Sequence, residues 1–180
     1  MQKHFLIALS AMSIAYNPLA VFEASSAGKP DLLRVGIDWN GRVDYSINPF
    51  VLKDQNSLTI ASGWDYRKLH GIKVPLSGGS GCRSYADSKS KTDKYTLCIA
   101  VTPKGNNTFN VEYDEKRYDS NPGATGDTMF NITVNFDIYI NGSSCSISPI
   151  SASTLSHKGS GKIIPSPATR FTNVNCRVNA

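Results

Sequence analysis

Residues 130–140 read FNITVNFDIYI and alternate apolar and polar side chains without a break. The apolar set is Phe130, Ile132, Val134, Phe136, Ile138 and Ile140. Successive side chains of a β-strand point to opposite faces, so this pattern predicts a long strand with one buried and one wetted face. Such strands are typical of antiparallel sheets, in which one face covers the core and the other meets water.

Shorter alternating patterns occur on both sides of this stretch, at residues 32–39, 42–47, 56–62, 71–76, 94–102 and 107–114. Turn-forming residues separate them: Asn40-Gly41, Gly78-Gly79, Lys104-Gly105 and Asn121-Pro122-Gly123. No segment after residue 27 shows sustained helical periodicity. The sequence therefore predicts an all-β fold, an antiparallel β-sandwich. Residues 146–168, rich in Ser, Pro and Gly, predict an irregular excursion before a strand-like pattern returns at 169–176.

The first residues are typical of a cleaved export signal. Lys3 and His4 precede an apolar stretch, and small residues follow up to Ala27. We therefore expect residues 1–27 to be a signal peptide and residues 28–180 to form a single sandwich domain, with a candidate sub-boundary near 141–145. No later run approaches the roughly 20 apolar residues of a spanning helix, so no membrane span is expected.

The four cysteines are Cys82, Cys98, Cys145 and Cys176. An even number in an exported chain favours disulfides, and the cysteines lack the paired spacing of a zinc site. Of the three pairings that four cysteines allow, neighbour pairing is the simplest. Cys82–Cys98 would close a polar loop rich in Gly, Ser and Lys, and Cys145–Cys176 would tie the end of the chain to the strand before it.

Composition disfavours several classes of function. The net charge is +5, but basic and acidic residues are interspersed and no stripe of basic and aromatic residues predicts nucleic-acid binding. Only His70 and His157 follow the predicted signal, and no GxSxG or HExxH motif is present. We expect no catalytic residues, no cofactor and no metal, although a pair of carboxylates that meet in space stays an open alternative.

The most unusual polar and aromatic cluster is SGWDYRKLHG, residues 62–71. Trp64, Tyr66, Arg67 and His70 are the candidate ligand-binding residues, because aromatic faces stack on sugars or protein partners and charged groups add directional hydrogen bonds. The alternative is that Trp64 is a core residue at a strand end and the rest is a surface turn. Trp39, beside Asn40-Gly41, presents the same choice.

Residues 145–176 carry a resemblance to a known family. Cys145 is followed by Phe171, Val174 and Cys176, which is similar to the start of a bacterial chaperone–usher pilin domain, where such a strand closes a disulfide. Phe171 stands one residue out of the family's usual register. The resemblance implies an immunoglobulin-like or pilin-like sandwich, exported through the periplasm to a bacterial fimbrium. It also implies other fimbrial subunits, a periplasmic chaperone and an usher as partners, with a host glycan or protein as receptor.

Pilins of this family donate an alternating N-terminal strand to the next subunit. Leu33, Val35, Ile37 and Trp39 offer such a face, and the alternative is an ordinary first strand. The expected function is that of a fimbrial subunit or adhesin-like protein in pilus assembly and host-surface attachment. A secreted carbohydrate- or receptor-binding module, such as a toxin's binding subunit, is the alternative, and a secreted hydrolase is a third class.

Overall fold

The computed structural model describes residues 31–40, 46–63, 71–86, 94–119, 128–142, 144–158 and 164–179. These residues form β-strands joined by turns. The strands are β1 (Asp31–Trp39), β2 (Ser46–Ile47), β3 (Phe50–Lys53), β4 (Ser57–Ala61), β5 (Ile72–Pro75), β6 (Gly79–Ala86), β7 (Lys94–Gly105), β8 (Thr108–Asp119), β9 (Thr128–Asn141), β10 (Ser144–Lys158), β11 (Ile164–Pro167) and β12 (Phe171–Asn179).

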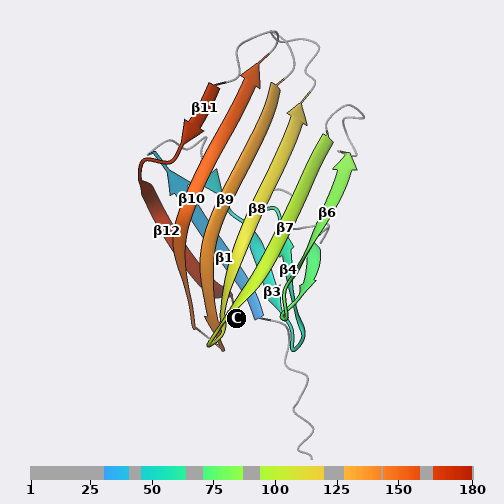
Figure 1. Cartoon of the computed structure of the whole chain (residues 1–180), viewed down its shortest axis with the longest axis vertical. Helices are drawn as coiled ribbons and strands as arrows, with labels where there is room; N and C mark the ends of the chain where they lie inside the picture. The colour runs from blue at the N-terminus through green and yellow to red at the C-terminus, as the bar shows by residue number, and fades with distance from the viewer. Residues whose placement is uncertain are drawn as a thin grey trace, which may run out of the picture.

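The strands make two antiparallel sheets that pack face to face. Sheet A has the order β12-β1-β3-β4-β5, with β2 paired to β1, and sheet B has the order β11-β10-β9-β8-β7-β6. Figure 1 shows sheet B in front and the strands of sheet A running across it behind. The predicted all-β sandwich is confirmed. No helix long and apolar enough to cross a membrane is found in the described part of the chain.

The predicted alternating stretch of residues 130–140 lies in β9, near the middle of sheet B. Ile132, Val134, Phe136, Ile138 and Ile140 are buried, while the residues between them face outward. They meet apolar side chains from sheet A, so one core fills the space between the sheets. At roughly 2 kcal/mol for each large side chain removed from water, this contact is the main stabilising term of the fold.

Four strands have no counterpart among the predicted ones: β3, β6, β10 and β11. In β10, Ile147 faces inward before the irregularity between Pro149 and Ser151, and Ala152 and Thr154 face inward after it. A β-bulge inserts one residue and changes which positions face the core, so no single alternation covers the strand. The predicted irregular excursion after Cys145 is therefore wrong, because most of that segment is strand.

Strands β3 and β6 lack a visible alternation for other reasons. In β3, Phe50 and Val51 are both buried although they face opposite sides of sheet A. In β6, glycine and serine dominate, and these residues have little intrinsic preference for strands.

Both predicted disulfides are confirmed. Cys82 and Cys98 lie directly opposite each other on β6 and β7. The sequence predicted that this bridge closes a polar loop, and in the structure it joins two paired strands. Cys145 on β10 and Cys176 on β12 have Cα atoms 5.9 Å apart. Because β10 belongs to sheet B and β12 to sheet A, the second bridge holds the two sheets together.

The candidate donor strand is an internal strand of sheet A. β1 pairs with β12 on one side and with β2 and β3 on the other. The side chains of Leu33, Val35, Ile37 and Trp39 are at most 2% exposed in the chain's own core. This arrangement matches the alternative of an ordinary first strand, because donation to another subunit would remove all four side chains from that core.

The candidate sub-boundary near 141–145 lies at a hairpin. Asn141 ends β9, Ser144 begins β10, and the two strands are paired along their length. The segments before and after this hairpin therefore share sheet B. The predicted signal peptide, residues 1–27, lies outside the described residues.

Candidate binding cleft on the outer face of sheet A

The predicted ligand-binding residues Trp64, Tyr66, Arg67 and His70 lie outside the described residues, so their placement stays a prediction. The described chain reaches Gly63 before this segment. A Cβ atom at Gly63 would lie 2.2 Å from the backbone oxygen of Asn48, so only glycine permits this close approach of two backbones.

Gly63 and Asn48 contribute to the rim of a cleft of about 320 Å³ on the outer face of sheet A. Its other lining residues come from three strands of that sheet, β1, β3 and β12: Arg34, Val35, Phe50, Asn175 and Arg177. We call it the arginine cleft. Its volume lies at the small end of the range for ligand sites, which is suited to a compact ligand.

Two arginines line this cleft. Arg34 on β1 and Arg177 on β12 are cross-strand partners, and both are exposed. The guanidinium carbon of Arg34 lies 4.8 Å from the centre of the Phe50 ring, within range of a cation–π contact. Arg34 thus contributes to the burial of Phe50 on the outer side of the sheet.

An amide group lies beside the arginines because β1 carries a glycine there. Gly36 pairs with Asn175, and a Cβ atom at Gly36 would lie 2.7 Å from the Asn175 amide nitrogen. The Asn175 side chain therefore extends over the backbone of β1. Its amide nitrogen also donates a hydrogen bond of 2.9 Å to the carbonyl of Asn173, which orients the amide at the cleft.

A second charged group lies inside the sandwich, close to the start of the same undescribed segment. Glu115 on β8 is 1% exposed and accepts three hydrogen bonds. Arg117 Nε donates one at 2.6 Å, the Ser62 hydroxyl one at 3.3 Å, and the Tyr113 hydroxyl the third. Ser62 follows β4, so this cluster joins the two sheets.

The hydrogen bonds and the pKa of Tyr113 indicate that the Glu115 cluster has a structural role. Burial raises the pKa of Tyr113 well above its ordinary value, and the negative charge of Glu115 raises it further. Tyr113 therefore keeps its proton and donates a hydrogen bond to the Glu115 carboxylate. None of these side chains lines the arginine cleft, so the cluster has no access to a ligand bound there.

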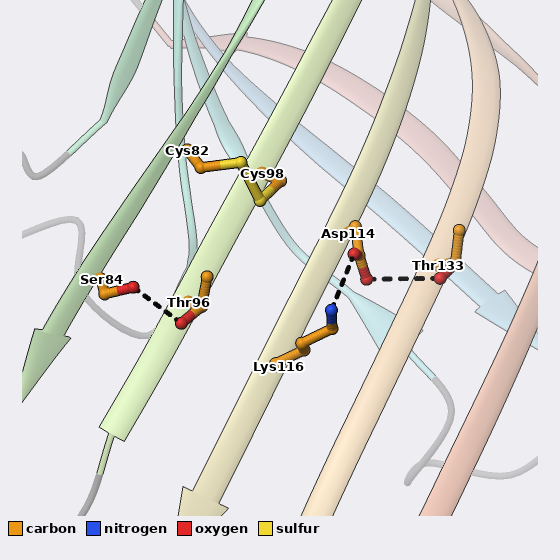
Figure 2. Close-up of a disulfide and its surroundings, with 7 residues drawn as sticks. All are labelled: Cys82, Ser84, Thr96, Cys98, Asp114, Lys116 and Thr133. Atoms are coloured by element: carbon orange, nitrogen blue, oxygen red, sulfur yellow. Dashed lines mark hydrogen bonds and ion pairs between the residues drawn. A yellow bond between two sulfur atoms is a disulfide. The ribbon is translucent and has the colours of Figure 1, made fainter.

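The outer face of sheet B contrasts with that of sheet A. Two of its cations are paired with acids: Lys104 lies 2.7 Å from Asp137, and Lys116 lies 3.7 Å from Asp114. Hydrogen bonding by Lys104, assisted by Asn110, lowers the pKa of Asp137 below its usual value. Figure 2 shows Lys116, Asp114 and the Cys82–Cys98 bridge on this face, where Asp114 also accepts a hydrogen bond from Thr133.

The arginine cleft could be found in the sequence only in part. Arg34 stands on the polar side of a predicted strand, and Arg177 follows the last cysteine. Nothing in a single sequence shows that strands from opposite ends of the chain pair. Within the described ranges, no three His, Cys, Asp or Glu side chains gather to hold a metal ion.

Comparison of the chain with protein-family models, with curated proteins and with solved structures finds no match.

Proposed function

We propose that this chain is an exported, adhesin-like protein that attaches to a surface by binding a ligand in the arginine cleft. The observation that supports this most directly is the cleft itself. It is lined by two exposed arginines and by Asn48 and Asn175. Such convergent hydrogen-bonding groups are what a binding site needs to fix a polar ligand.

The two disulfides support export. Disulfides persist in oxidising compartments such as the periplasm or the cell exterior. Both cysteine pairs are bridged, and one bridge holds sheet A against sheet B next to the cleft, since Cys176 lies between Asn175 and Arg177. A bridge at this place keeps one wall of the cleft rigid, which lowers the entropy lost on binding.

Attachment, and not donation of β1, is the role that we propose. A fimbrial subunit that donated β1 would have to separate it from β12 and β3 and expose its buried side chains. Deleting residues 28–40 should therefore unfold the protein. If the shortened chain instead folds and only loses the ability to polymerise, strand donation is the better account.

The test of attachment uses the full chain, exported to an oxidising compartment and purified with its disulfides intact. Saturable binding to epithelial cells or to a glycan array is expected, without turnover of the bound material. Fractionation of the producing cells shows whether the protein is part of fimbriae or is secreted freely into the medium. Absence of saturable binding, or release of a product from the bound glycan, would contradict it.

A further inference from the structure

We propose that the ligand of the arginine cleft is an acidic saccharide whose carboxylate lies between Arg34 and Arg177. This inference rests on the proposed binding function and names the chemical class of its ligand. A guanidinium group matches a carboxylate with two parallel hydrogen bonds, which makes Arg the preferred partner for such an anion.

The first support is the position of the two arginines. Like charges directly opposite each other in an antiparallel pair destabilise the sheet. Arg34 and Arg177 occupy such positions, and Arg177 forms no ion pair with any other described residue. An anion bound in the cleft would give Arg177 a partner of opposite charge, which it lacks among the described residues.

The second support is the small extent of the positive charge. Lys73, on β5 at the far edge of sheet A, lies 3.1 Å from Asp54 and is thereby compensated. Among the described residues, the cations that line the cleft are Arg34 and Arg177, on the β1–β12 pair. A nucleic acid needs a track of cations along its backbone. The cleft instead fits a single carboxylate.

The third support is the polar character of the lining. Val35 and Phe50, the apolar lining residues, are 2% and 6% exposed and offer little surface to a lipid or an apolar peptide. Asn48 and Asn175 are exposed, and amides both donate to and accept from hydroxyl groups. Arginines that bind a carboxylate and amides that bind hydroxyl groups together fit an acidic sugar.

The experiment measures binding of the full disulfide-bonded chain by calorimetry to sialyllactose, its methyl ester and lactose. The acidic sugar should bind at least about 10-fold more tightly than either neutral probe, because both lack the charge-assisted hydrogen bonds. Arg177→Gln should weaken sialyllactose binding by roughly 10- to 100-fold, and Arg177→Lys by less, since it keeps the charge.

Two further variants test the geometry. Lys116→Gln removes one positive charge from the opposite sheet and should change affinity by less than about 2-fold, since a remote exposed charge is screened. Gly36→Ala should displace the Asn175 amide and weaken binding several-fold while the net charge stays the same.

Three outcomes would overturn the inference: equal binding of lactose and sialyllactose, an Arg177→Gln protein with unchanged affinity, or tighter binding of poly-glutamate or single-stranded DNA. If cells are bound through the cleft but no acidic sugar is, the ligand class is wrong and the attachment function stands. If neither cells nor sugars are bound, the attachment function fails as well.

Discussion

Glu115 and Arg177 both carry a charge on a β-strand, but their surroundings are opposite. Glu115 is buried and meets a cation and two hydroxyl groups, so its charge and its hydrogen-bonding capacity are satisfied within the protein. Arg177 is exposed on the outer face of sheet A and stands opposite a second arginine. Glu115 therefore has its partners without a ligand, whereas Arg177 has no ion-pair partner among the described residues.

This difference separates a stabilising role from a binding role. A buried cluster with every partner present costs stability when one member is removed. Two like charges at paired positions of neighbouring strands cost stability, and natural proteins retain such costs where function needs them. Substitutions should therefore show that Glu115 stabilises the fold and that Arg177 serves binding.

Glu115→Ala should give the largest effect. It leaves the guanidinium of Arg117 and the buried hydroxyls of Tyr113 and Ser62 without their acceptor, and should lower the free energy of unfolding by about 3–5 kcal/mol. Urea denaturation measures this change. Glu112→Ala, on the exposed side of the same strand, is the control and should change stability by less than about 0.5 kcal/mol. A loss below about 1 kcal/mol in Glu115→Ala would show that the cluster is not structural.

Removing either disulfide should cost about 3 kcal/mol, but only one should affect the cleft. Replacing Cys145 and Cys176 by Ala frees β12 from sheet B and should weaken ligand binding as well as stability, because Arg177 follows Cys176 directly. Replacing Cys82 and Cys98 removes a bridge on the outer face of sheet B and should leave binding unchanged. Equal binding losses in the two variants would mean that the cleft does not depend on the inter-sheet bridge.

The fold was predictable where one alternation runs through a whole strand, as in β9. The alternation could not be seen in β10, where a bulge changes which positions face inward, or in β3, where Phe50 is buried beneath Arg34 on the outer side. These are tertiary effects that no local pattern contains.

The candidate site was predictable to a smaller degree. The sequence pointed to residues 62–71 as a cluster rich in aromatic and charged groups, and Gly63, a described residue of that stretch, lines the arginine cleft. The arginines themselves escaped prediction. Their significance arises only when β1 and β12 pair, and that pairing joins the two ends of the described chain.

Stability should fall in alkali through Tyr113. Because its pKa is raised, the folded state keeps the proton that the unfolded chain loses above about pH 10, so the stabilisation is full below that pH and decreases above it. The decrease for one group approaches about 1.4 kcal/mol per pH unit. Unfolding measured from pH 8 to 11 should show a flatter profile for Tyr113→Phe than for the unmodified protein. Parallel profiles for the two proteins would contradict the prediction.

The smallest effect expected is a gain. Arg177→Gln removes the like-charge repulsion with Arg34 and should raise the free energy of unfolding by about 0.5 kcal/mol, while the same change weakens binding. Thermal unfolding at low ionic strength measures it, and the gain should shrink as salt is added. A loss of 1 kcal/mol or more would mean that Arg177 stabilises the free protein, contrary to its assignment as a binding residue.

The most direct measurement of the central claim is an amide chemical-shift map of the labelled protein titrated with sialyllactose, with lactose as the control. We predict saturable shifts at Arg34, Gly36, Asn175 and Arg177, and none at Asp114, Lys116 and Thr133 on the outer face of sheet B. Lactose should produce much smaller shifts at the same positions. Shifts confined to sheet B, or equal shifts with both sugars, would contradict an acidic-saccharide site in the arginine cleft.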